Sequence, residues 1–227
     1  ITLTGATIHI GDGKVIEEGI ISFNDGIITQ VSPKGTSISA GSEMIDVKGK
    51  HIYPGIISLN TTVGLQEIAS VRATLDFNEI GELNPHVRAL VAYNTDSEVI
   101  PTLRNNGILL SQAVPQGGII SGTSSLFYAD GWNWEDAVLR ADDGIWMNWP
   151  SFLSRSFNYA DFTSSVKRND KRQVVIDKLY SSFRDAKAYA ELESPSPVNL
   201  RMAAMKNLFN GKTNLYIRAN YAKDIIE

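Results

Sequence analysis

The sequence contains no cysteine and only three histidines, His9, His51 and His86, among its 227 residues. The missing thiols exclude disulfide bonds, thiolate metal sites and a cysteine nucleophile. A metal ion would therefore need histidine, aspartate or glutamate ligands. Three histidines make that requirement severe, so the main question about this chain is whether it can hold a metal.

Long apolar runs and basic runs are also absent. No stretch approaches the roughly 18 apolar residues of a membrane span, so we expect none. The chain has 21 Lys and Arg against 25 Asp and Glu, a formal net charge of −4. Without a basic run there is no electrostatic footprint for nucleic acid, which we exclude as a partner. With 43% hydrophobic and 20% charged residues, the composition rules out disorder and fibrous repeats.

Both ends of the sequence lack ordinary boundary signals. It begins at Ile1 in a strand-like run, without an initiator Met or a signal-type segment, and it stops inside a helical pattern at residues 221–227. We therefore expect a fragment of a longer polypeptide. Removal of a signal peptide would make it an exported chain, periplasmic or secreted. A shortened sequence explains the missing Met equally well.

Residues 1–53 read as short β-strands separated by turns. Asn24-Asp25-Gly26 between β-branched runs is typical of a β-hairpin turn. The last strand, residues 51–53, follows a Lys-Gly-Lys turn. This pattern predicts a small β-sandwich domain over residues 1–53, or the N-terminal part of one.

Residues 54–227 alternate short apolar strands with helical stretches. This alternation predicts an α/β architecture with a parallel sheet and crossover helices. About four βα units are visible where a (β/α)8 TIM-type barrel needs eight, so we expect a partial barrel. The strands are predicted at residues 55–59, 107–114, 125–129 and 214–220, and the helices at 96–106, 134–139, 171–192, 198–209 and 221–227.

Residues 53–65 resemble the junction at which the β-domain of the amidohydrolase superfamily enters its barrel. The family run is Pro-Gly, two hydrophobic residues and Asp-x-His-x-His, and here Gly49-Lys50 precedes Pro54-Gly55 as in the family. Further on, the Gly-Gly-x-x-Ser-Gly run at residues 117–122 resembles imidazolonepropionase-related amidohydrolases. The resemblance covers essentially the whole chain, as the N-terminal half of such a protein.

The resemblance implies a hydrolase that acts on carbon–nitrogen bonds other than peptide bonds. Such enzymes use zinc or another divalent metal, whose bound water attacks the substrate while an Asp takes up the proton. It also implies that the remaining C-terminal half of the barrel is the partner of this chain. The strand that would carry the catalytic Asp lies beyond residue 227, so no catalytic residue is assigned.

The sequence departs from the family at the metal-ligand positions. Asn60 and Thr62 stand where the family has its two histidines, and Ser58 stands at the preceding acidic position. Arg218 stands where a later family strand carries a histidine. Amides and hydroxyls are poor zinc ligands, and a guanidinium stays protonated. We therefore expect no metal cofactor in this fragment. Arg218 is expected to fill the space of the cation and to pair with a nearby carboxylate, unless it is an ordinary strand-end residue.

Two further features are candidates for ligand binding. Gln116, Gly117 and Gly118 follow a predicted strand, so their amides could cradle a carboxylate or carbonyl oxygen. The alternative is that the glycines only permit a tight turn. Arg88 could bind an anionic substrate group bidentately, or it could lie in a solvated, salt-bridged segment.

Two functions follow from these patterns. The first is an amidohydrolase-like hydrolase. The second is a metal-free pseudoenzyme domain that binds a small-molecule ligand or scaffolds a catalytic barrel. The four tryptophans could stack a ring-shaped ligand, but we expect them to pack between a helix and the barrel. They are Trp132, Trp134, Trp146 and Trp149.

Overall fold

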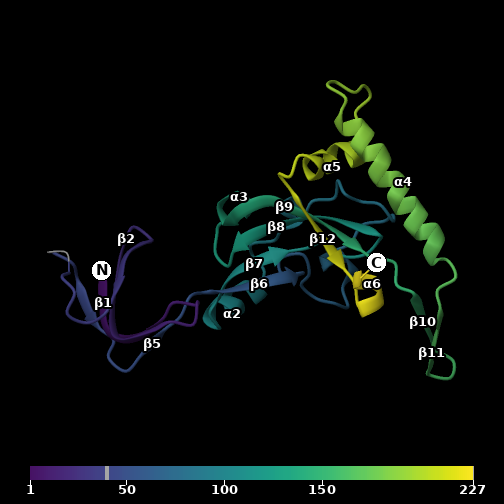
Figure 1. Cartoon of the computed structure of the whole chain (residues 1–227). Helices are drawn as coiled ribbons and strands as arrows, with labels where there is room; N and C mark the ends of the chain where they lie inside the picture. The colour runs from purple at the N-terminus through teal and green to yellow at the C-terminus, as the bar shows by residue number, and fades with distance from the viewer. Residues whose placement is uncertain (39–40, 227) are drawn as a thin grey trace. The chain divides into compact units, whose positions relative to one another are not determined.

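The computed structural model describes residues 1–38 and 41–226. The chain divides into two compact units, Ile1–Ile56 and Ile57–Glu227 (Figure 1). Each unit has its own hydrophobic core. We describe the two units separately.

The first unit is a five-stranded sheet. Its strands are β1 (Thr2–His9), β2 (Val15–Asn24), β3 (Ile27–Ser32), β4 (Met44–Asp46) and β5 (His51–Ile52). β1, β2 and β3 pair antiparallel, while β4 and β5 both run parallel to β1. In the predicted hairpin turn between β2 and β3, Asp25 and Gly26 have φ of 49° and 77°. Positive φ at both central residues is the type I′ geometry, so the hairpin is confirmed. The described residues of this unit form one sheet, and the sandwich stays a prediction.

The second unit combines a five-stranded sheet, helices packed on it and a projecting two-stranded hairpin (Figure 1). Its strands are β6 (Ile56–Thr61), β7 (Ile108–Ala113), β8 (Ile120–Tyr128), β9 (Val138–Asn148), β10 (Leu153–Asn158), β11 (Thr163–Arg168) and β12 (Asn214–Arg218). Its helices are η1 (Arg72–Thr74), α1 (Ala89–Ala92), α2 (Val99–Asn105), α3 (Trp134–Ala137), α4 (Arg172–Ala190), α5 (Leu200–Phe209) and α6 (Ala222–Ile226).

The main sheet has the order β12-β9-β8-β7-β6. β9 and β12 are parallel, but β7, β8 and β9 form an antiparallel meander. The predicted alternation of strands and crossover helices is therefore wrong between residues 107 and 148. Six residues join β7 to β8, which is too short for the crossover that parallel strands need. The predicted helix at residues 134–139 ends at Ala137, where β9 begins.

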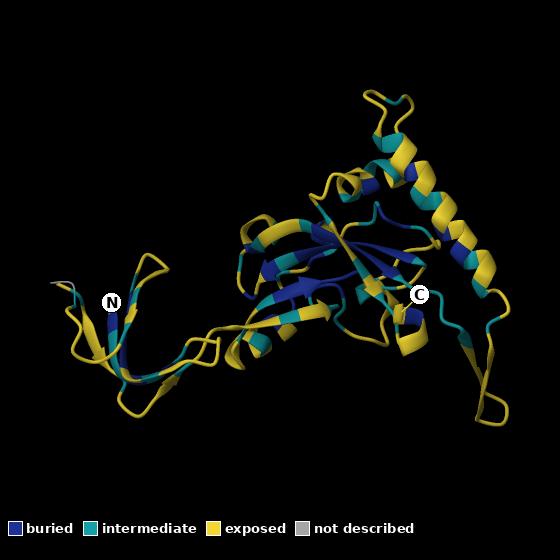
Figure 2. Cartoon of the chain, viewed as in Figure 1, coloured by how far each residue is buried: buried dark blue, intermediate teal, exposed yellow. Residues whose placement is uncertain are grey.

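Helices α4 and α5 pack on one face of this sheet. Ile120, Ile145 and Met147 of the sheet form a core cluster with Leu179 of α4 and Met205 of α5. A second cluster joins α1 and α2 to β7 and β8. The buried residues accordingly concentrate along β7, β8 and β9 (Figure 2). The helices predicted at residues 171–192 and 198–209 are confirmed by α4 and α5.

The strands at the two ends of the sheet are exposed. Ile57 and Leu59 of β6 are 49% and 66% exposed to solvent, and Ile217 of β12 is 52% exposed. The prediction of a buried strand at residues 55–59 is therefore wrong, because β6 is the last strand of an open sheet. The curled sheet is a half-barrel. None of the helices in the described part is both long and apolar enough to cross a membrane.

Candidate functional site

Arg218, the last residue of β12, lies at the centre of the candidate site. Its Nη2 and Nε donate to Asn60 Oδ1 at 2.7 and 3.2 Å, and Nη1 donates to Ser121 Oγ at 3.4 Å. β12 and β6 are the first and last strands of the sheet, which in a flat sheet would lie about 19 Å apart. No arginine side chain spans that distance. The contact therefore requires the sheet to curl, and the curl brings these residues together.

The indole ring of Trp146 in β9 packs against the face of the Arg218 guanidinium. The Arg218 Cζ lies 4.5 Å from the centre of the Trp146 ring, a cation–π distance. Tyr216 stacks on the same indole with 4.7 Å between ring centres. The indole Nε1 donates to Ser124 Oγ at 2.9 Å. Gly144 leaves room for this stack, because a Cβ there would collide with the Tyr216 ring.

The charge of Arg218 is balanced by no carboxylate within the described residues. Its acceptors are the Asn60 amide oxygen, the Ser121 hydroxyl and the Pro115 carbonyl, all of them neutral. The expected pairing of Arg218 with a carboxylate is therefore wrong. The amide oxygen of Asn60 takes that place. Burial lowers the pKa of Arg218, but a guanidinium remains protonated at neutral pH. The site thus presents a half-buried positive charge.

A buried carboxylate, Asp143, connects the two sides of this site. Asp143 is 7% exposed. It accepts hydrogen bonds from Gln112 Nε2 at 2.7 Å, Ser124 Oγ at 2.7 Å and the Tyr216 hydroxyl at 3.3 Å. The Gln112 Oε1 accepts in turn from the backbone N–H of Asn60 at 3.3 Å. Asp143 therefore fixes Trp146 through Ser124, and Asn60 through Gln112.

The loop of Gln116, Gly117 and Gly118 is connected to Arg218 by Ser121, which hydrogen-bonds to both. Asn148 Nδ2 donates to the carbonyls of Gly117 and Gly118 at 3.3 and 2.8 Å, and Ser121 Oγ donates to Gly117 at 2.7 Å. Gly117 and Gly118 have φ of 79° and 60°, so they do permit a tight turn. The backbone amide of Gln116 already donates to Phe77. The cradle for a ligand oxygen stays a prediction.

The other predicted site residues lie elsewhere. Thr62 follows the end of β6, and its hydroxyl donates to Gln66 Oε1 at 3.5 Å. Asn60 has φ of 53°, which interrupts the regular alternation that would have aimed both side chains at one point. Arg88 binds Asp142 bidentately, and this hydrogen-bonded carboxylate raises the pKa of Arg88. No contact joins Thr62 or Arg88 to Arg218 among the residues described.

The side chains around Arg218 do not fit zinc. The Asn60 amide and the Ser121 hydroxyl are poor zinc ligands, and the protonated guanidinium of Arg218 cannot bind a metal ion. Across residues 1–38 and 41–226, no group of three His, Asp or Glu side chains is placed to hold a metal ion. His9 and His51 lie in the first unit, where their ring nitrogens are 3.0 Å apart.

Sequence reasoning missed Asp143, Ser121 and Asn148, and for Trp146 it favoured packing over stacking with a ring-shaped ligand. Ser121 lies in the Gly-Gly-x-x-Ser-Gly run, which was the one available signal. Asp143 could have been suspected because it lies two residues before the apolar strand residues Ile145 and Trp146. Asn148 carried no signal in the sequence, because its hydrogen bonds to Gly117 and Gly118 join distant parts of the chain.

Comparison with known proteins identifies the fold. No family model and no curated protein matches the sequence. The chain is similar to the crystal structure of an amidohydrolase from Thermotoga maritima MSB8, with a TM-score of 0.81 and 19% sequence identity. The match covers 99% of this chain and 59% of the Thermotoga chain. At this identity the likeness shows an amidohydrolase-like fold, of which the chain spans less than two thirds.

Proposed function

We propose that this chain is the ligand-binding part of an amidohydrolase-like protein in which a fixed guanidinium, in place of a metal ion, receives an anionic ligand. The observation that carries the proposal is the position of Arg218. It is held by Asn60 at the ends of two strands, over the face of Trp146, and its described acceptors are all neutral. An uncompensated charge in a partly dry environment favours an anion strongly.

A small carboxylate is the ligand class that suits this geometry. Guanidinium groups bind carboxylates with short, directional hydrogen bonds of about 2.7–2.9 Å. Two of the Arg218 contacts, to Ser121 Oγ and the Pro115 carbonyl, are 3.4 Å long and therefore weak. A carboxylate can replace these two contacts while the 2.7 Å bond to Asn60 keeps the side chain in place.

Tryptophan fluorescence during an acetate titration tests the proposal, because Trp146 lies directly beneath Arg218. We expect a saturable change that sodium chloride at equal ionic strength does not reproduce and that is the same in protein treated with EDTA and then dialysed free of it. Elemental analysis of the same sample should show no stoichiometric transition metal. Loss of the response on chelation, together with about one metal per chain, would contradict the proposal.

Hydrolysis of carbon–nitrogen bonds other than peptide bonds is the second candidate function. The likeness to the Thermotoga amidohydrolase favours it. Because Asn60, Thr62 and Arg218 do not fit zinc, any metal ligands for this activity would have to be other residues of the whole protein. Stoichiometric metal in the elemental analysis would support this second function.

We further propose that additional strands of a longer protein cover the free edges of the half-barrel. The exposed apolar side chains of Leu59 and Ile217 support this, as does the match to only 59% of the Thermotoga chain. In hydrogen exchange, amides of β6 and β12 should exchange more slowly in a longer protein than in residues 1–227. Equal exchange in both would contradict the proposal.

A further inference from the structure

We propose a second ligand site, a cleft that binds a free α-amino acid with an apolar side chain. The cleft has a volume of about 320 Å³ and lies between the main sheet and α5. Its charged lining is Arg88 and Asp142, which we call its polar end, and its apolar wall is Ile145, Leu200, Ala203 and Ala204. The cleft is also lined by the polar side chains of His86, Thr123, Asn207 and Thr213. That volume falls at the small end of the range for ligand pockets, about 300–1,000 Å³. It therefore suits a molecule of amino-acid size.

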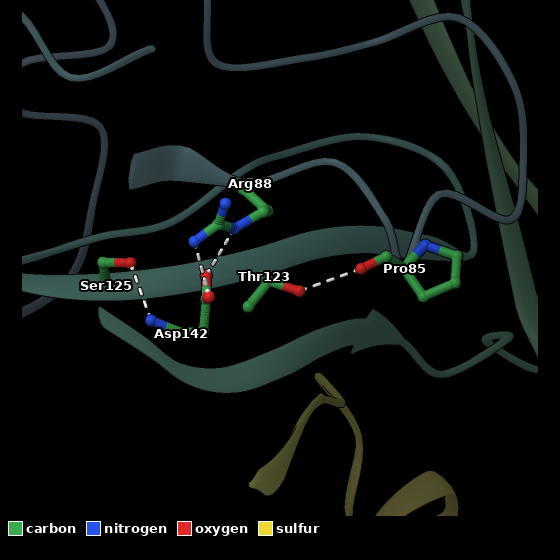
Figure 3. A network of polar contacts seen from close by, with 5 residues as sticks. All are labelled: Pro85, Arg88, Thr123, Ser125 and Asp142. Atoms are coloured by element: carbon green, nitrogen blue, oxygen red, sulfur yellow. Dashed lines mark hydrogen bonds and ion pairs between the residues drawn. The ribbon is translucent and has the colours of Figure 1, made fainter. Parts of the chain in front are cut away.

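The polar end presents both signs of charge side by side. Arg88 Nε and Nη2 donate to Asp142 Oδ1 and Oδ2 at 2.9 and 2.7 Å (Figure 3). The two side chains are 42% and 39% exposed, and Arg88 Nη1 has no partner among the described residues. A simple anion would be repelled by Asp142, and a simple cation by Arg88. A zwitterion satisfies both, with its carboxylate on Arg88 and its ammonium on Asp142.

The backbone holds this ion pair in a conformation that is costly to maintain. Asp142 has φ of 51°, a value that residues other than glycine rarely adopt. Its amide nitrogen donates to Ser125 Oγ at 3.0 Å, and Thr123 Oγ1 donates to the Pro85 carbonyl at 2.8 Å, which fixes the neighbouring loop (Figure 3). Strained residues of this kind concentrate at functional sites. A surface salt bridge alone contributes too little to account for the strain.

The apolar wall receives the side chain of the amino acid. Leu200 remains 67% exposed although it lines the cleft, and the two alanines of α5 leave the space open. An aliphatic side chain of leucine size would cover these groups and remove apolar surface from water. The charges select the α-amino acid backbone, and the wall selects an apolar side chain.

This cleft is separate from the Arg218 site. Thr123 lines the cleft, whereas its neighbour Ser124 bonds to Asp143 and Trp146. Because adjacent strand residues point to opposite faces of a sheet, the two sites lie on opposite faces of β8 and β9. The test below is therefore independent of the proposed function.

Isothermal titration calorimetry of the protein with L-leucine tests the proposal. We expect saturable binding, and at least tenfold weaker binding of N-acetyl-L-leucine and of L-leucinamide, each of which lacks one of the two charges. Asp142→Asn should also weaken L-leucine binding at least tenfold, because asparagine tolerates the positive φ but removes the charge. Ala203→Phe should abolish binding by filling the cleft. Lys206→Ala, on the same helix but outside the cleft, should leave it unchanged.

Three results would overturn the proposal. They are absence of L-leucine binding at millimolar concentration, equal binding of N-acetyl-L-leucine, and unchanged binding by a folded Ala203→Phe variant. The two leucine analogues are measured on the unsubstituted protein, so the test stands even if a variant fails to fold.

Discussion

Replacing Arg218 with methionine should abolish the fluorescence response to acetate. Methionine has a similar length and keeps apolar contact with Trp146, but it removes every donor. Hydrogen bonds to charged groups contribute about 1.5–3 kcal/mol, which corresponds to a loss of affinity of roughly tenfold to hundredfold. Acetate binding that is weak at the outset would then fall below detection. The measurement is the acetate titration of both proteins under identical salt.

Two further substitutions separate charge from shape at this site. Arg218→Lys keeps the charge but loses the planar fork that grips Asn60 Oδ1, so binding should weaken only in part. Asn60→Asp places a carboxylate at the atom that now accepts the 2.7 Å bond. It should neutralise Arg218 and abolish acetate binding while every N–H donor of Arg218 is kept. Acetate binding by Asn60→Asp as strong as in the parent protein would show that the charge of Arg218 is not what attracts the anion.

The sequence predicted which residues lie at the centre of this site, but it did not predict how their side chains are arranged. Asn60 and Arg218 were singled out because the sequence resemblance aligns them with family ligand positions, and the structure brings their side chains together. Thr62 was singled out by the same rule, yet the positive φ of Asn60 ends the alternation on which the rule depends. A single backbone angle of this kind leaves no trace in a hydrophobic pattern.

In the fold as well, some elements could be predicted from the sequence and others could not. Helix α4 was predictable because a long amphipathic stretch specifies a helix locally. Helix α5 was predictable because prolines precede it and Asn210-Gly211 follows it. The antiparallel meander of β7, β8 and β9 was not, since apolar strand runs look alike in parallel and antiparallel sheets. The pairing of Arg88 with Asp142, 54 residues later, depends on that meander and could not be read from spacing.

Asp143→Ala should produce the largest loss of stability in the second unit. It removes the acceptor of Gln112 Nε2, Ser124 Oγ and the Tyr216 hydroxyl in a buried position. Each buried donor left without a partner costs about 1–3 kcal/mol. We expect a decrease of about 3 kcal/mol in the free energy of unfolding, or roughly 6–12 °C in Tm for a unit of this size. Urea unfolding followed by tryptophan fluorescence measures it, because all four tryptophans lie in this unit.

Tyr216→Phe is the matched control for this measurement. It removes the 3.3 Å bond to Asp143 and the long, exposed 3.4 Å bond from Asn214 Nδ2, and it keeps the ring on Trp146, so it should cost about 1 kcal/mol or less. Asp143→Ala should also weaken acetate binding, because Gln112 then loses the bond that orients it toward Asn60. A folded Asp143→Ala variant with unchanged stability would show that the buried carboxylate is not what holds the two sides of the site together. In that case the position of Arg218 would depend on Asn60 and Trp146 alone.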